Sequence, residues 1–379
     1  MTIFSNLLAD KQWFIIFTFF LLAWVIQLFY YVIIYFRFVF YKKKAPDYSS
    51  EPVSVIICAR NEAENLDNYL PVLLTQDYPD YEVIVVDDCS TDDTDIILKK
   101  YTALYPHLRS SVIKMDKKFS HGKKLAVTIG IKAAKHDRLL FTDADCHPES
   151  NQWLSLMTAH FSDKVSIVLG YGGYFTQPGM LNRYIRWDTL MIALQYFSYA
   201  LIRKPYMGVG RNLAYKRSLF YGGKGFANHF HLASGDDDLF VNEHATRTNT
   251  AIEFSLQSHT RTAPKHSYDR WYFQKKRHMS TSTLYKTGHK FLLGLEPAGR
   301  LVFYATLVAL LFSEIYWPLA LIAFSVRMII MLIVIKKTMI RLNEKNILVI
   351  SLLFDLISLF INAGLYLSSR FRPVNYQWK

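Results

Sequence analysis

The chain has 379 residues, of which 51% are hydrophobic and 16% aromatic, and its formal net charge at pH 7 is +13. This length leaves room for one domain of ordinary size plus membrane segments, and the apolar content argues against a wholly water-solvated protein. The positive charge suits nucleic acid, an anionic membrane or anionic substrates, but no compact basic and aromatic nucleic-acid motif is present. We therefore expect a membrane partner and no nucleic acid. The cysteines, Cys58, Cys89 and Cys146, show no zinc-like or disulfide spacing and are expected to be buried thiols.

The first long apolar stretch, residues 13–36, is long enough to span a bilayer. It is too long for a signal-peptide core and shows no evident small-residue cleavage site. Lys42, Lys43 and Lys44 follow it directly. By the positive-inside rule, the N-terminus is expected outside and the following domain in the cytoplasm. We therefore expect residues 1–44 to anchor a multi-pass protein in the plasma (inner) membrane of a bacterium.

Residues 45–265 are predicted to form a soluble α/β domain. Strands are expected at 53–58, 82–86, 111–115 and 138–143, and helices at 61–76, 92–105 and 122–134, with Pro71 weakening the first helix. Strands that alternate with helices predict a doubly wound, mostly parallel sheet. The domain would be inserted between membrane helices.

The fourth strand ends in two carboxylates one residue apart, Asp143 and Asp145. Ligands of open α/β sheets bind outside the carboxyl ends of strands, and alternate residues of an extended segment point the same way. Two such carboxylates can hold a hard divalent cation, although a strand that ends in a polar turn gives the same pattern. Asp87 and Asp88 end a neighbouring strand, and Lys123 begins a helix whose amides could help it bind a phosphate.

Neither a P-loop nor a dinucleotide-binding glycine pattern is present. Residues 208–212 form a small-residue loop that a ligand could approach closely. Residues 234–239 carry Asp236, Asp237 and Asp238 before an apolar helix start, a pattern also typical of a helix N-cap. Residues 266–298 are expected to include an amphipathic helix on the membrane surface, carrying Gln274, Arg277 and His278.

The last segment, residues 299–379, is apolar again. Spans are predicted at 299–314, 317–336 and 347–369, or else the first of these is a re-entrant or surface helix, which would change the side of the C-terminus. Arg327 and Asp355 lie near the middle of the last two spans, where charges usually face a partner or a cavity. At about 1.5 Å per residue they fall within roughly 3 Å of the same depth, so we predict that they pair.

The motifs between residues 50 and 285 together resemble those of membrane-anchored family 2 glycosyltransferases with a GT-A domain, of the polysaccharide synthase and ceramide glucosyltransferase type. Ala59, Arg60 and Glu62 resemble the segment that holds the nucleoside, and Asp87 and Asp88 the motif that contacts base and ribose. His121-Gly122-Lys123 resembles the basic donor motif, and Asp143-Ala144-Asp145 the metal-binding D-x-D. Gly210, Arg211 and Asn212 resemble the acceptor loop, Asp236 the general base of T-E-D, and Gln274, Arg277 and His278 the Q-x-x-R-W motif.

Two residues depart from the family pattern. Gly235 replaces the usual Glu, which leaves Asp237 as a second candidate base, and His278 replaces the Trp frequent in polymer-forming members. The resemblance implies Mg²⁺ or Mn²⁺ and an inverting transfer from a nucleotide-diphosphate sugar, expected to be a UDP-sugar, to a lipid or glycan hydroxyl. Lys123, Arg277 and His278 would assist the departing diphosphate. The alternatives are a processive polysaccharide synthase and a membrane scaffold with a degenerate transferase domain.

Overall fold

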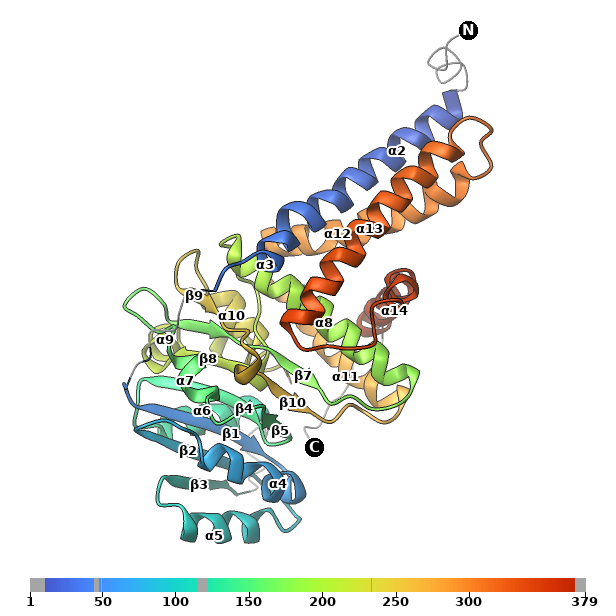
Figure 1. The fold of residues 1–379 in the computed structure, drawn as a ribbon. Coiled ribbons are helices and arrows are strands. Elements are labelled where there is room, and N and C mark those ends of the chain that lie inside the picture. Colours follow the sequence, from blue (N-terminus) through green and yellow to red (C-terminus); the bar gives the residue numbers. More distant parts are fainter. Residues whose placement is uncertain (1–10, 44–47, 49, 115–121, 233, 372–379) are drawn as a thin grey trace.

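The computed structural model describes residues 11–43, 48, 50–114, 122–232 and 234–371, with side chains to residue 369. The chain forms two bodies in contact (Figure 1): an α/β domain, and a bundle of long helices made from both ends of the described chain. His121 lies outside the described residues.

The main sheet has seven strands in the order β3-β2-β1-β4-β8-β6-β9. The four strands predicted from the sequence are all present and parallel, so the doubly wound α/β expectation is confirmed. The later strand β8 runs antiparallel to both of its neighbours. The bounds are β1 Val53–Ala59, β2 Tyr81–Asp88, β3 Leu108–Ile113, β4 Arg138–Asp143, β6 Ile167–Leu169, β8 Leu213–Lys216 and β9 Thr250–Ile252.

A second sheet of three short strands, in the order β5-β10-β7, lies beside the first. It is built from residues in which the sequence showed no clear period. Its strand β5 begins directly after Asp145, so the D-x-D segment connects the two sheets. The bounds are β5 Cys146–Pro148, β7 Gly172–Tyr174 and β10 Thr260–Thr262.

Helices cover both faces of the main sheet because its central strands are apolar on both sides. In β1, Ile56 packs in the core shared with α6, whereas Val55 and Ile57 pack in the core shared with α4, α5 and α7. Pro71 is accommodated inside α4. The helix bounds in this domain are α4 Ala63–Leu74, α5 Thr94–Leu104, α6 Lys123–Ala133, α7 Trp153–Thr158, α8 Met180–Leu201, α9 Arg217–Gly222, α10 Asp238–His244 and α11 Tyr268–Thr281.

Among the described residues, four helices are long and apolar enough to cross a membrane. The N-terminal one is α2 (Lys11–Leu28), continued by a π-helical stretch (Phe29–Tyr35) and α3 (Phe36–Val39). The others are α12 (Thr287–Leu310), α13 (Trp317–Arg341) and α14 (Ser351–Phe371). The expected start of the first C-terminal span at residue 299 was wrong: the helix already begins at Thr287. The sequence analysis missed the part of this helix before residue 299 because Glu296 and Pro297 interrupt its apolar pattern.

The predicted pair of Arg327 and Asp355 is confirmed, with Nη1 and Oδ2 2.8 Å apart. The same carboxylate accepts from Arg300 Nη1 at 2.9 Å and from the Tyr304 hydroxyl at 2.6 Å. Glu296 Oε1 lies 3.5 Å from Arg300 Nε. We call Glu296, Arg300, Tyr304, Arg327 and Asp355 the membrane cluster. Its two acids and two cations balance, as buried charges require.

A second buried ion pair fixes the α/β domain to the bundle. Glu344, in the turn between α13 and α14, pairs with Arg186 of α8 at 2.6 Å and with Arg261 of β10. Tyr171 donates to the same carboxylate at 3.0 Å. This contact could not be predicted from the sequence, because Arg186, Arg261 and Glu344 lie far apart along the chain.

Candidate active site

The carboxyl ends of the parallel strands meet at one edge of the main sheet. The strand register pairs Cys58 with Asp143 and Ala59 with Asp87, so the two acidic motifs lie on either side of β1. This confirms that two different strands deliver carboxylates to one edge. Such an edge is where open α/β sheets bind ligands.

The segment after β1 and the segment after β2 hold each other in place. The Ser90 amide donates to Asp87 Oδ1 at 3.1 Å, the Asn61 amide donates to Ser90 Oγ at 2.9 Å, and Arg60 Nη1 lies 4.0 Å from Asp88 Oδ2. Ala59 is fully buried, so its side chain cannot reach a ligand. Glu62 accepts a hydrogen bond from Asn65. The predicted nucleoside-binding residues are therefore together, with Arg60 and Glu62 the more accessible ones.

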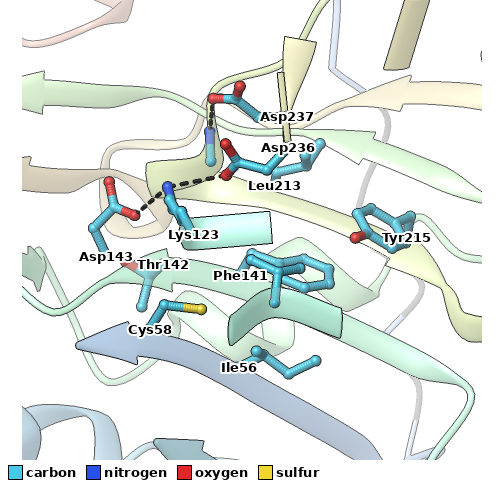
Figure 2. Close-up of a pocket in the computed structure, with 12 residues that line it drawn as sticks. Ile56, Cys58, Lys123, Phe141, Thr142, Asp143, Leu213, Tyr215, Asp236 and Asp237 are labelled. Atoms are coloured by element: carbon cyan, nitrogen blue, oxygen red, sulfur yellow. Dashed lines mark hydrogen bonds and ion pairs between the residues drawn. The ribbon is translucent and has the colours of Figure 1, made fainter. Parts of the chain in front are cut away.

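Lys123 occupies the centre of the site (Figure 2). Its ammonium lies 2.8 Å from Asp143 Oδ1 and 3.1 Å from Asp236 Oδ2, so it bridges two acids that are 93 residues apart in sequence. Burial alone would lower the pKa of Lys123, but Asp143, Asp236 and Asp237 outweigh it and hold that pKa well above its ordinary value. Burial by itself would raise the pKa of Asp143. The positive charge of Lys123 outweighs this effect, so the pKa of Asp143 lies below its ordinary value. Both groups are therefore charged at pH 7.

The three consecutive acids before α10 have three different environments. Asp236 faces Lys123, whereas Asp237 accepts backbone N–H bonds from Gly210 and Asp238, each at 2.7 Å. Asp238 is buried and accepts from Tyr285 at 2.7 Å and from Thr281. Burial, together with the charges of Asp236 and Asp238, raises the pKa of Asp237 from 3.8 to about 7. Asp237 is thus the N-cap that one sequence reading allowed.

The structure explains why residue 235 is a glycine in this chain. Its φ of +103° lies in the left-handed region, and a Cβ there would come within 2.5 Å of Leu239 Cδ1. The Glu usual in the family could not adopt this backbone without strain. This backbone therefore favours glycine at position 235, and Asp236 lies opposite Lys123.

The D-x-D segment offers oxygen ligands of the type that divalent cations prefer. Ligand atoms of Asp143, Asp145 and Cys146 lie within 4.8 Å of one another. Burial, then Asp145 and Asp143, raise the pKa of the Cys146 thiol well above its ordinary value, so it stays protonated and is a poor ligand. The two carboxylates remain, and they fit a hard cation such as Mg²⁺ or Mn²⁺.

The residues of the predicted acceptor loop, Gly210–Asn212, play different parts. A Cβ at Gly210 would lie 3.3 Å from Asp237 Oδ2 and from Lys123 Nζ, so a small residue keeps the loop against the site. Arg211 stacks over Tyr174, and its guanidinium carbon lies 4.4 Å from the centre of the Tyr174 ring. The charges of Asp143 and Asp145 act on the same guanidinium group.

The structure contradicts a contact between the Asn212 side chain and the acceptor. Asn212 is fully buried, and its Oδ1 accepts from Trp153 Nε1 at 3.0 Å. Its amide nitrogen donates to the carbonyls of Tyr171 and Ser258 at 2.9 and 2.7 Å. Both donors are used inside the protein, so Asn212 shapes the loop.

Helix α11 brings Arg277 and His278 near the site. The positive charge of Arg277 contributes to the lowered pKa of Asp143, which places the two near each other. Arg277 Nη2 lies 3.3 Å from His278 Nε2, which accepts its hydrogen bond. Desolvation, then Arg277 and Lys275, lower the pKa of His278 well below its ordinary value. The His278 side chain is nevertheless exposed, and it accepts a hydrogen bond from Arg277.

A contact that could not be predicted from the sequence anchors α11 to the loop of Asp236, Asp237 and Asp238. Thr281 and Tyr285, at and just beyond the end of α11, both donate to Asp238. The acidic loop and the helix of Gln274, Arg277 and His278 are thereby tied together. No pattern in the sequence signals this link.

The comparisons agree with this geometry. Residues 54–223 match the family Glycosyl transferase family 2. The glycosyltransferase AglE of Haloferax volcanii is 34% identical over 139 residues, which are 36% of this chain and 44% of that protein. The poly-beta-1,6-N-acetyl-D-glucosamine synthase of Staphylococcus epidermidis is 30% identical over 96 residues, 25% of this chain and 22% of that protein. The chain thus matches less than half the length of these curated relatives.

One solved structure shares the fold over nearly the whole chain. The mannosyltransferase PcManGT from Pyrobaculum calidifontis, in complex with GDP-Man and Mn²⁺, superposes with a TM-score of 0.60 at 20% identity, covering 94% of this chain and 98% of that chain. At this identity the likeness establishes the fold. Residues 54–223 therefore match glycosyltransferase family 2 within a domain of the GT-A fold, and this domain is joined to apolar helices long enough to cross a membrane.

Proposed function

We propose that this protein is a membrane-bound inverting glycosyltransferase that moves one sugar from a nucleotide-diphosphate sugar to a hydroxyl of a lipid acceptor. The observation that carries the proposal is the convergence of Asp143, Lys123 and Asp236 from three elements at the ligand edge of the sheet. A degenerate scaffold would have no reason to keep such a set of charges together.

On the donor side, Asp87, Asp88 and Arg60 would hold the nucleoside, and Asp143 and Asp145 would hold Mg²⁺ or Mn²⁺. When bound, the cation supplies positive charge to the diphosphate. Lys123 would exchange its carboxylate partners for phosphate oxygens, and Arg277 would stabilise the charge that develops as the bond to the sugar breaks. PcManGT was solved with GDP-Man and Mn²⁺, which supports a donor and cation of this class. A UDP-sugar is our expectation for this chain.

On the acceptor side, Asp236 would take the proton of the attacking hydroxyl, whose oxygen then bonds to the anomeric carbon as the diphosphate leaves from the opposite face. Both oxygens of Asp237 accept backbone N–H bonds, whereas Asp236 is bound through a side chain that a phosphate can displace. This difference supports Asp236 as the base, even though the pKa of Asp237, about 7, lies closer to neutral pH.

The surroundings of helix α11 support a lipid acceptor. Helix α11, which carries Arg277 and His278, packs along the apolar helix α14. Tyr272 of α11 donates a hydrogen bond to Ser368 of α14 at 2.5 Å. An acceptor at this position would approach from the membrane.

The base assignment is tested by comparing Asp236→Asn with Asp237→Asn. The release of nucleoside diphosphate from a panel of UDP- and GDP-sugars is measured with total membrane lipid as acceptor, alongside UDP binding. We expect Asp236→Asn to bind UDP normally and to lose turnover by roughly 10²-fold or more. Asp237→Asn, which preserves an N-cap, should lose less than about tenfold. The reverse ranking would assign the base to Asp237, and a product of many sugars would indicate a processive synthase.

A further inference from the structure

The last helix, α14, is placed differently from the rest of the bundle. Figure 1 shows α2, α12 and α13 running side by side, whereas α14 is foreshortened beside them, so its axis crosses theirs. Its first turn meets α8, where Phe354 lies 5.1 Å from Tyr184 and 5.6 Å from Trp187 between ring centroids. Its last turns meet α11 through Ser368. Contacts with the α/β domain near both ends favour a helix along the membrane surface over a fourth crossing helix.

A groove opens where α14 leaves the bundle. Its volume is about 450 Å³, within the ~300–1,000 Å³ range of small-molecule sites. The lining includes Tyr304 of α12, Phe324, Met328 and Ile329 of α13, and Leu352 and Leu356 of α14.

The chemistry of this lining selects an apolar occupant. Its two hydroxyls already donate within the protein, from Tyr304 to Asp355 at 2.6 Å and from Ser325 to the Leu321 carbonyl at 2.8 Å. A polar ligand would lose its hydrogen bonds to water and find few replacements here. Aliphatic and aromatic carbon forms the rest of the surface.

The groove is open toward its surroundings. Ile329, Leu352 and Leu356 are 58%, 38% and 36% exposed, although each is a large apolar side chain. Helices α12 and α13, which form two sides of the groove, are long and apolar enough to cross a bilayer. The medium at its mouth is then hydrocarbon, so a lipid chain can enter from the side.

Helix α14 contributes to the groove and also packs against the helix that carries Arg277 and His278. Leu352 and Leu356 belong to α14, which packs along α11, and α11 carries Arg277 and His278. We propose that the groove between α12, α13 and α14 binds a hydrocarbon chain of the acceptor lipid, which then runs along α14 to place its head group at the site. This inference rests on the proposed function and adds that the acceptor is a long-chain lipid gripped by the bundle.

Photocrosslinking tests the groove without requiring catalysis. The full chain is placed in phosphatidylcholine nanodiscs with traces of two diazirine probes, one built on undecaprenyl phosphate and one on dioleoylglycerol. We expect at least one probe to label peptides containing Met328, Ile329 or Leu356, and a large excess of unlabelled lipid of the same kind to remove this labelling. Labelling spread evenly over the exposed face of α2, or unaffected by the competitor, would show bulk lipid only and overturn the proposal.

Filling the groove provides the functional half of the test. Leu356→Trp should reduce transfer to membrane lipid at least tenfold and abolish the crosslink, while UDP binding stays unchanged. The matched control is Leu353→Trp, on the same helix, outside the groove lining and 48% exposed, which should retain both. Transfer and crosslinking that survive in Leu356→Trp would refute the groove. If the wild type transfers no sugar at all, the proposed function fails. The crosslinking still shows whether the groove binds a lipid chain.

Discussion

Two charge clusters in this molecule have the same arrangement with the signs of the charges reversed. In the active site one cation, Lys123, lies between two anions, Asp143 and Asp236. In the membrane cluster one anion, Asp355, lies between two cations, Arg300 and Arg327. The difference is exposure: the active-site side chains are 10–29% exposed, whereas those of the membrane trio are 0–8% exposed.

That difference indicates what each cluster can do. A partly exposed ion pair can exchange one partner for a ligand at modest cost, because water and ions already compensate its charges. A fully buried trio cannot lose a member without leaving an uncompensated charge. The active-site cluster is therefore suited to binding, and the membrane cluster to holding the helices in register.

The largest effect is expected from breaking the membrane cluster. Asp355→Ala leaves Arg327 buried without an acid and Arg300 with Glu296 alone, and should destabilise the protein by about 3–5 kcal/mol. Thermal unfolding in detergent measures this loss. The charge-conserving swap of Arg327→Asp with Asp355→Arg should recover part of it. A swap no better than the single variants would count against a direct pair, and a stable Asp355→Ala would contradict the structural role.

A smaller effect is expected from removing Asp145, the proposed metal ligand beside the active-site cluster. Asp145→Ala should weaken UDP binding in Mn²⁺ by roughly 100-fold, or about 2.7 kcal/mol, and leave the fold intact. Binding in a chelator should be equal for the variant and the wild type, because the acid acts only through the cation. Equal binding in Mn²⁺ as well would remove Asp145 from the metal site.

The smallest effect concerns Asp237, whose pKa is raised from 3.8 to about 7 in the folded protein. The folded state then holds this proton more tightly than the unfolded state, so this group lowers stability as the pH rises from about 4 to 7. Asp237→Asn removes that dependence and should raise the melting temperature by a few degrees at pH 8 but not at pH 4. Equal melting temperatures at pH 8 would mean that Asp237 ionises without penalty.

The sequence could predict the acidic edge of the main sheet because local patterns indicate it directly. The apolar run that ends in Asp143 and the parallel order of β1, β2 and β4 follow from strand periodicity and chain order. The Arg327–Asp355 pair followed from the cost of charges at matching depth. Each of these inferences needs only the neighbouring residues and the helical rise.

The remaining features depend on contacts between distant segments. The loop position of Asn212 suggested a contact with the acceptor. In the structure its side chain is buried against Trp153, and its amide group is hydrogen-bonded within the protein. The anchoring of Asp238 by Tyr285 and of Glu344 by Arg261 joins segments 47 and 83 residues apart. Helix α8 was missed because it is buried on more than one face and so lacks a single apolar stripe.

The most direct test of the central claim is hydrolysis of a panel of nucleotide sugars by the detergent-purified protein, with Mn²⁺ and with a chelator, beside Asp145→Ala. We predict that one donor releases its nucleoside diphosphate in Mn²⁺, and that both the chelator and the substitution abolish this release. Release that persists in the chelator would contradict a metal-dependent transferase. If no donor is hydrolysed and UDP does not bind with or without metal, the protein is a scaffold rather than an enzyme.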